Sequence, residues 1–185
     1  GLNAAARCME QMNVDIAILT ETKLTNNKYT RSSSGYSIIA TKAEGINCGG
    51  VALLYRPGKN WLLESTKTFG PNVIRATIVS GRLRYSLIGV YIPPSEEDGT
   101  TLGWVQKAKD EANNNKWATI LLGDLNVDLD KGDENMSKTG ATRRVETAAL
   151  LDSMGLTSMR GQFRQKQRFR WKFWTWHSTR NGVHI

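Results

Sequence analysis

The sequence "ILLGDLNVDLD" at residues 120–130 gives the strongest single indication of the fold and its chemistry. Its apolar start predicts the end of a buried strand. Asp124, Asn126, Asp128 and Asp130 then fall within seven positions. A turn would explain these residues, because Asp and Asn side chains hydrogen-bond to nearby backbone. A metal site would explain them as well, because carboxylate and amide oxygens are hard ligands.

The size of the chain allows one domain with a hydrophobic core, and its charge is positive. It has 185 residues, 39% of them hydrophobic, and 25 Lys and Arg against 17 Asp and Glu give a formal net charge of +8. Such a balance favours a polyanion partner such as nucleic acid, through phosphate contacts and counterion release. A surface that is merely basic and soluble is the alternative. We expect a single domain over residues 1–185.

The cysteines and the hydropathy pattern disfavour a zinc site and a membrane span. Cys8 and Cys48 lie 40 residues apart, and the sequence has no Cys-x-x-Cys motif and no Cys/His cluster. Two isolated thiols suit a reducing compartment, although one disulfide is compatible with them. No apolar run approaches the roughly 20 residues that a spanning helix needs. We expect no membrane partner and an intracellular location, nuclear or cytoplasmic.

The hydrophobic pattern predicts an order of elements that disfavours a doubly wound parallel sheet. Helical spacing predicts helices over 3–13, 101–114 and 142–155, the last with Thr142 as N-cap and Gly155 as its stop. Because the central strands follow one another without helices between them, mixed sheets with outer helices fit better. Strands are predicted over 15–22, 36–42, 49–57, 61–69, 73–80, 84–94, 117–124 and 169–178.

Polar side chains follow three of the predicted strands. Glu21 ends "AILTET", Tyr91 ends "LIGVY", and Asp124 and Asn126 end "TILLGDLN". In α/β folds, sites gather just beyond strand ends. Oxygen ligands suit Mg²⁺, with Mn²⁺ as an alternative, and such an ion stabilises charge on a phosphate oxygen.

Taken singly, each of these residues has a structural explanation. Glu21 can cap a turn, Tyr91 can be a packing tyrosine, and "GDLN" can be an Asx turn. Their combination favours a site, whereas Asp128 and Asp130 are typical loop residues.

The segment "RGQFRQKQRFRWKFWTWHSTR" at 160–180 is basic and aromatic. It contains seven Lys or Arg residues interleaved with Phe and Trp. Basic groups can meet phosphates while rings stack on bases or wedge into a groove. The alternative is an amphipathic strand with its aromatic side chains inward and its charges outward, and both can hold for one strand.

Five segments, in this order, resemble the endonuclease/exonuclease/phosphatase superfamily. Within it, the chain most resembles the endonuclease domain of LINE-type, non-long-terminal-repeat retrotransposons, over nearly its whole length. The resemblance implies an α/β fold, a four-layer α/β/β/α sandwich with two mixed sheets. The segments are "LTETKL" (19–24), "GGVALLYR" (49–56), "GVYIPPS" (89–95), "LLGDLNVDL" (121–129) and "FWTWHS" (173–178).

The resemblance also implies roles for the residues at the strand ends. Glu21 matches the metal-binding Glu of the family. Asp124 matches the Asp that aligns the attacking water or the leaving group, and Asn126 matches the Asn that contacts the scissile phosphate. Tyr91 matches the active-site Tyr near that phosphate.

The basic and aromatic segment supplies the expected DNA contacts. Thr175 falls where these enzymes place a DNA-contacting residue at the rim. We expect it to act with Trp176, Arg168, Arg170 and Lys172.

Parts of the family pattern are missing from the 185 residues. The family begins with a strand that bears an Asn, and it ends with an Asp strand and a Ser-Asp-His motif. His177 and His184 are the only histidines, and neither lies in a Ser-Asp-His sequence. His184 suits a solvated position and His177 an edge contact. We expect a domain truncated at both ends, without its first strand and its C-terminal catalytic strands, and inactive or very weak by itself.

The resemblance implies a Mg²⁺-dependent DNA endonuclease that nicks a phosphodiester so that the 3′-hydroxyl primes reverse transcription. We expect a monomer within a longer polyprotein that includes a reverse transcriptase. One alternative is a phosphoesterase acting on small phosphorylated lipids or inositols. Another is a non-catalytic nucleic-acid-binding remnant, which the missing residues favour.

Overall fold

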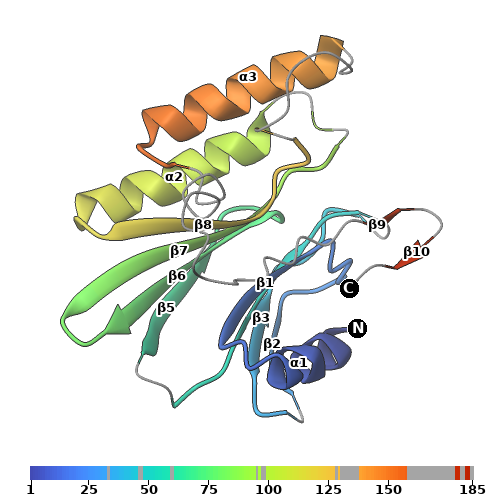
Figure 1. Ribbon diagram of the computed structural model, residues 1–185, viewed down its shortest axis with the longest axis vertical. Helices are drawn as coiled ribbons and strands as arrows, with labels where there is room; N and C mark the ends of the chain where they lie inside the picture. Colours follow the sequence, from blue (N-terminus) through green and yellow to red (C-terminus); the bar gives the residue numbers. More distant parts are fainter. Residues whose placement is uncertain are drawn as a thin grey trace, which may run out of the picture.

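The chain folds into two four-stranded sheets packed face to face, with helices on both outer faces (Figure 1). The computed structural model describes residues 1–32, 34–45, 48–58, 61–94, 96, 99–127, 129, 138–157, 178–179 and 182–183. From bottom to top, Figure 1 shows helix α1, the first sheet, the second sheet, and helices α2 and α3. This order confirms the predicted four-layer α/β/β/α sandwich.

The first sheet is antiparallel throughout and carries α1 (Leu2–Gln11) on its outer face. Ala6 and Met9 of that helix are buried against Tyr36, just before β3, and Leu54 of β4. Its strand order is β1-β4-β3-β2. The strands are β1 (Ile16–Thr20), β2 (Lys28–Arg31), β3 (Ser37–Ala40) and β4 (Val51–Tyr55).

The second sheet, in the order β5-β6-β7-β8, is mixed, because its last pair is parallel. A parallel pair needs a crossover connection, and α2 (Thr100–Asn114) provides it between β7 and β8. The prediction of two mixed sheets therefore holds for this sheet only, since loops without helices join the strands of the first sheet. The strands are β5 (Leu62–Thr68), β6 (Val73–Ser80), β7 (Leu83–Tyr91) and β8 (Ala118–Asp124).

The two sheets enclose an apolar core and approach each other closely at Gly89 of β7. A Cβ atom at that glycine would lie 2.6 Å from Cδ1 of Ile18 on β1. The glycine thus leaves room for the first sheet to pack on the second near the C-terminal end of β7. Buried residues of this core are Val51, Leu53, Ile74, Ala76, Ile78, Leu87 and Tyr91.

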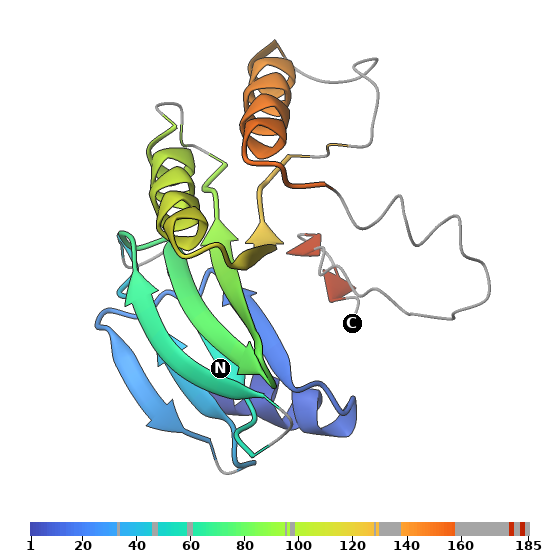
Figure 2. The same ribbon diagram turned by 90° about the vertical axis from the view of Figure 1, so that its left-hand side faces the viewer.

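Helices α2 and α3 (Lys138–Ser153) lie on the same side of the second sheet (Figure 2). Val105 and Ala108 of α2 are buried against Ile88 and Val90 of β7. A guanidinium nitrogen of the nearly buried Arg75 lies 3.1 Å from a carboxylate oxygen of Glu111, so an ion pair also holds α2 to the sheet.

Several sequence predictions for local structure need correction. Helix α3 begins at Lys138, so Thr142 lies inside the helix and is not its N-cap. The prediction was wrong because the preference of Thr for N-cap positions is only a weak local signal. Strand β2 was not predicted, because its four residues are mostly exposed and carry no apolar alternation. Gly155 does follow the end of α3, with φ +64° and a bond from Leu156 N to Leu151 O of 2.9 Å.

The predicted strand over 169–178 falls outside the described residues except for Ser178, which begins β9 (Ser178–Thr179), paired with β10 (Gly182–Val183). Cys8 and Cys48 are free thiols, so they form no disulfide. Of the helices in the described ranges, none is long and apolar enough to cross a membrane.

A substitution at Gly123, which precedes the last residue of β8, tests whether the backbone at the end of this strand requires glycine. Its φ is +145°, and an added Cβ would lie 1.8 Å from the Val90 carbonyl oxygen. We expect Gly123→Ala to lower the free energy of unfolding by at least about 2 kcal/mol, because backbone atoms cannot move aside. Urea unfolding measures this change.

Gly103→Ala is the matched control, because an added Cβ at this helical glycine meets nothing within 4 Å. We expect this variant to be stabilised by about 0.5–1 kcal/mol. Equal unfolding free energies for the two variants would contradict the assigned role of Gly123.

Candidate functional site

Glu21 lies in the segment that turns away from β1 immediately after its last residue, Thr20. Its φ is +52°, in the left-handed region that residues with a Cβ seldom adopt. Two backbone bonds hold the turn: Thr22 N donates to Gly50 O at 3.2 Å, and Lys23 N donates to Gly49 O at 3.1 Å. The glutamate is therefore fixed by the loop that precedes β4.

Tyr91 is the last residue of β7, and its side chain reaches from the second sheet to the first. The residue is 2% exposed, and its hydroxyl donates a hydrogen bond of 2.8 Å to Oε1 of Glu21. The other carboxylate oxygen, Oε2, lies 3.7 Å from Nζ of Lys23, at a half-exposed position. The Glu21 carboxylate thus has one side toward the core and one side toward solvent.

Asp124 is the last residue of β8 and is paired in register with Tyr91 across the parallel strands. Parallel strands end at the same sheet edge, which is why two residues 33 positions apart in sequence lie together. The backbone continues this pairing, since Ile92 N donates to Asp124 O at 2.9 Å. Asp124 is exposed.

Asn126 completes an Asx turn that starts at Asp124. Its backbone N donates to Oδ1 of Asp124 at 2.9 Å, and its Nδ2 donates to Ile92 O at 2.8 Å. The structural explanation of "GDLN" is therefore correct. The turn is compatible with a site, because among the described residues the Asp124 carboxylate accepts only from the Asn126 backbone, while the Asn126 side-chain amide is held by the Ile92 carbonyl.

The Tyr91 hydroxyl is held in its protonated form. Burial and the hydrogen bond to Glu21 raise the pKa of this hydroxyl well above its ordinary value. The negative charges of Glu21 and Asp124 raise the same pKa further, since they disfavour a phenolate. Tyr91 is consequently a hydrogen-bond donor at neutral pH and orients the Glu21 carboxylate.

The oxygen groups at this end of the molecule are of the chemical type that Mg²⁺ prefers. Among the described residues, no three His, Cys, Asp or Glu side chains cluster as a metal site. Mg²⁺ does not need three, because it keeps several waters and takes one or two carboxylates. Glu21 and Asp124 are two carboxylates whose charges both act on the Tyr91 hydroxyl.

Two buried polar atoms lie around the Gly49–Gly50 loop that supports Glu21. The hydroxyl of Thr22 and Nδ2 of Asn72 have no hydrogen-bond partner within the described part of the chain. Such groups are rare and call for an explanation.

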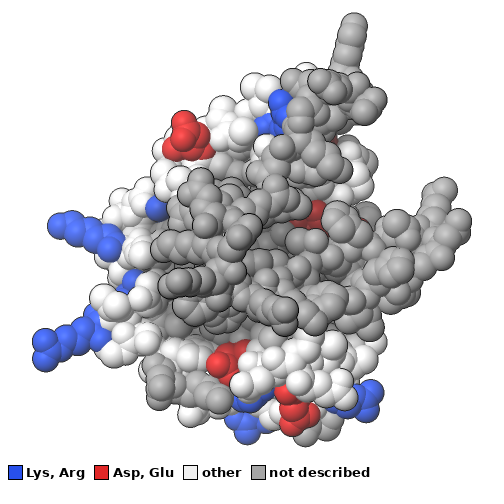
Figure 3. All heavy atoms as spheres, viewed as in Figure 1, with Lys and Arg blue, Asp and Glu red and all other residues white. Residues whose placement is uncertain are grey.

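The predicted DNA-contacting residues lie outside the described residues, as do Asp128, Asp130, His177 and His184. They are Arg168, Arg170, Lys172, Thr175 and Trp176. On the face seen in Figure 3, the visible Lys and Arg of the described residues lie at the left margin, near the top and along the lower edge, and acidic side chains are scattered over the same face. On this face their charge forms no single patch.

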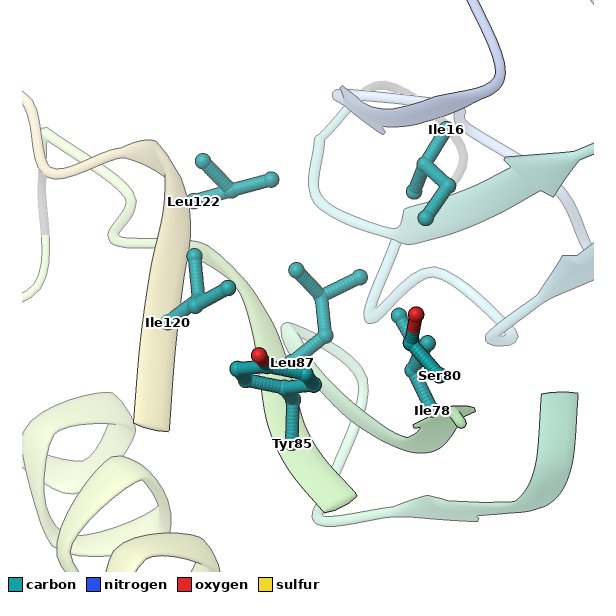
Figure 4. A pocket seen from close by; sticks show the side chains of 7 residues that line it. All are labelled: Ile16, Ile78, Ser80, Tyr85, Leu87, Ile120 and Leu122. Atoms are coloured by element: carbon teal, nitrogen blue, oxygen red, sulfur yellow. The ribbon is translucent and has the colours of Figure 1, made fainter. Parts of the chain in front are cut away.

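A cavity of about 280 Å³ opens between the sheets, away from the polar site. Figure 4 shows Ile120 and Leu122 of β8 facing Ile16 of β1 across it. Because Ser80 and Tyr85 bring its only side-chain polar groups, this cavity does not suit a phosphate. The other lining residues are Ile78 and Leu87.

Sequence reasoning missed Asn72, Gly49 and Gly50, which support the turn of Glu21. Asn72 is 1% exposed, and its Oδ1 accepts a bond of 3.1 Å from Gly50 N. The Gly-Gly pair was a usable signal, because two successive glycines mark backbone with unusual φ. Nothing around Asn72 in the sequence distinguishes it from an ordinary turn asparagine.

Replacement of Tyr91 by Phe tests the bond between the sheets. We expect Tyr91→Phe to lose about 1 kcal/mol of stability at pH 7, because Glu21 loses a buried donor. The folded-state pKa of Tyr91 is raised above its unfolded value near 10, so this contribution is complete below pH 10 and is lost as the pH rises beyond it.

Urea unfolding of both proteins between pH 7 and pH 11 measures the difference. It should shrink above pH 10. A difference that stays constant up to pH 11 would contradict the assigned protonation of Tyr91. The remaining tyrosines and the lysines are common to both proteins, so they cancel.

In comparisons with known proteins, no protein-family model and no curated protein sequence matches the chain. Among solved structures, it is similar to the endonuclease domain of TRAS1, a telomere-specific non-LTR retrotransposon, with a TM-score of 0.57 and 14% identity over 83% of this chain. It is also similar to a functionally unknown conserved protein of Enterococcus faecalis V583, with a TM-score of 0.50 and 12% identity over 78% of this chain.

TDP2 from Caenorhabditis elegans aligns less well, with a TM-score of 0.47 and 20% identity over 74% of this chain and 43% of TDP2. The chain spans 64% of the length of the TRAS1 domain and 62% of the Enterococcus faecalis protein. At these identities the likeness concerns architecture. The two packed sheets with outer helices are the endonuclease/exonuclease/phosphatase fold, as the sequence motifs predicted.

Proposed function

We propose that this chain is a metal-dependent nuclease that hydrolyses phosphodiester bonds in DNA. The observation that carries the proposal is the meeting of Glu21, Tyr91 and Asp124 at one end of the two sheets. These three come from separate strands, and two of them are carboxylates. The fold and the net charge of +8 are compatible with an anionic, phosphate-bearing substrate.

Each side chain has a distinct part in this proposal. Glu21 would hold Mg²⁺, or Mn²⁺, on its solvent side, with Asp124 as the second carboxylate. The bound ion would neutralise charge that develops on a phosphate oxygen. Tyr91 keeps its proton and fixes the orientation of Glu21.

The polar groups beyond β8 would act on the substrate. The exposed Asp124 carboxylate can accept a proton from water and so align it for attack. The Asn126 amide, fixed by its bond to Ile92, would contact the scissile phosphate. A contact of Tyr91 with the phosphate stays a prediction, because its hydroxyl donates to Glu21 here.

The likeness to the TRAS1 endonuclease domain supports a narrower form of the proposal. The chain would nick DNA to expose a 3′-hydroxyl that primes reverse transcription, as an intracellular, monomeric part of a polyprotein with a reverse transcriptase. Arg168, Arg170, Lys172, Thr175 and Trp176 would contact the DNA, with the basic groups on phosphates and the rings on bases.

Cation binding tests the site without requiring turnover. We expect Mn²⁺, measured by isothermal titration calorimetry, to bind the 185-residue protein, and Glu21→Ala to weaken binding at least about tenfold, or about 1.4 kcal/mol. Glu64→Ala is the control, because it also removes a half-exposed carboxylate, one that is paired with Arg84 on the second sheet. Equal weakening in both variants would contradict a site at Glu21.

Plasmid nicking in Mg²⁺ tests the reaction. Because the sequence has no Ser-Asp-His motif, we expect slow or undetectable nicking by these 185 residues. Any nicking should stop with EDTA, with Glu21→Ala and with Asp124→Ala, and should persist in Glu64→Ala. Nicking that survives in both site variants would refute the site assignment, whereas robust nicking lost in both would support it and refute the expected weakness.

Two other outcomes separate the alternatives. Salt-dependent DNA binding with no cation binding would favour a non-catalytic nucleic-acid-binding protein. Hydrolysis of a small phosphoester without DNA cleavage would favour a phosphoesterase.

A further inference from the structure

Asn72 lies between the two halves of the proposed site and is bonded to both. It precedes β6 and is 1% exposed. Its backbone carbonyl accepts a bond of 2.9 Å from Tyr91 N, and its side-chain Oδ1 accepts a bond of 3.1 Å from Gly50 N. One residue of the second sheet thus contacts the end of β7 and the loop that precedes β4.

That loop determines where Glu21 lies. Gly49 and Gly50 have φ values of +82° and +87°, and their carbonyl groups accept the backbone N–H groups of Lys23 and Thr22. The left-handed backbone of Glu21 is costly for a residue with a side chain. These two bonds therefore hold a conformation that the isolated turn would leave.

The packing around Asn72 leaves no room for side chains at positions 49 and 50 of the loop before β4. A Cβ at Gly49 would lie 2.9 Å from Oδ1 of Asn72, and a Cβ at Gly50 would lie 2.5 Å from Oγ1 of Thr22. The loop can pass between Asn72 and the turn only because both positions are glycine. A second bond joins the two halves next to Asn72, since the Thr41 hydroxyl donates to Pro71 O at 2.5 Å.

We infer that Asn72 is a positioning residue that sets the placement of the Glu21 carboxylate relative to the Tyr91 hydroxyl. Its carbonyl fixes Tyr91, and its amide oxygen fixes Gly50 and, through the loop, the turn of Glu21. For catalysis and cation binding, the inference rests on the proposed function. For geometry, it stands on the hydrogen bonds alone.

The test compares amide hydrogen exchange by NMR in the 185-residue protein and two variants. In Asn72→Ala, we expect exchange at Gly50, Thr22 and Lys23 to speed up by about tenfold or more, because local opening becomes easier. Thr77→Val is the matched control on β6: it removes an equally buried polar group, bonded to Ser65 at 3.1 Å, away from the site. It should leave those three amides unchanged.

A conservative variant separates the hydrogen bond from general packing. Asn72→Asp keeps an oxygen where Oδ1 accepts from Gly50, so we expect the slow exchange at Gly50 to return. Any cost of a buried carboxylate would appear in urea unfolding and not as local opening. The inference would be overturned if Asn72→Ala left exchange at the three amides unchanged. It would also be overturned if Thr77→Val changed that exchange as much as Asn72→Ala does.

Mn²⁺ affinity then connects the placement to the proposed function. We expect Asn72→Ala to weaken binding about tenfold, with Thr77→Val unchanged, because Glu21 samples more orientations. If the unsubstituted protein binds no Mn²⁺, the proposed function fails, and the exchange pattern still decides whether Asn72 positions Glu21. If the unsubstituted protein binds Mn²⁺ and Asn72→Ala binds it with the same affinity, the positioning role is overturned.

Discussion

The hydrogen bond from the Tyr91 hydroxyl to Glu21 joins two sheets whose facing surfaces pack through an apolar core. Apolar packing is non-directional and tolerates small shifts of one sheet over the other. A 2.8 Å bond between buried and half-buried groups does not. The proposed site depends on this alignment of the sheets, and Gly89 leaves room for the Ile18 side chain of the first sheet.

Both sheets position the two bonded residues, and they do so through backbone hydrogen bonds as well as side-chain contacts. Tyr91 is placed by β7, while Glu21 is placed by a turn that depends on Gly49 and Gly50. Asp124 follows from the parallel pairing of β8 with β7, which the crossover through α2 makes possible. A site built on strand ends in this way is more rigid than one built on free loops.

Much of this architecture could be predicted from local sequence. Strands β7 and β8 of the second sheet contain continuous apolar runs, and residues 73–80 of β6 were predicted with the observed bounds. The polar residues after three strands pointed to Glu21, Tyr91 and Asp124. Their mutual placement could not be predicted from pattern, because the Tyr91–Glu21 bond spans 70 residues and depends on how the sheets face. Asn72 was missed for the same reason, since its role lies in a bond to Gly50, 22 residues away.

The left-handed backbone of Glu21 explains why side-chain length matters at this position. Glycine, asparagine and aspartate adopt such a φ more easily than glutamate does. Aspartate would keep the negative charge, but it is one methylene shorter and would fall short of a hydroxyl anchored in the opposite sheet. Glutamate at position 21 reaches the Tyr91 hydroxyl of the opposite sheet, although its backbone takes a left-handed conformation that residues with a side chain seldom adopt.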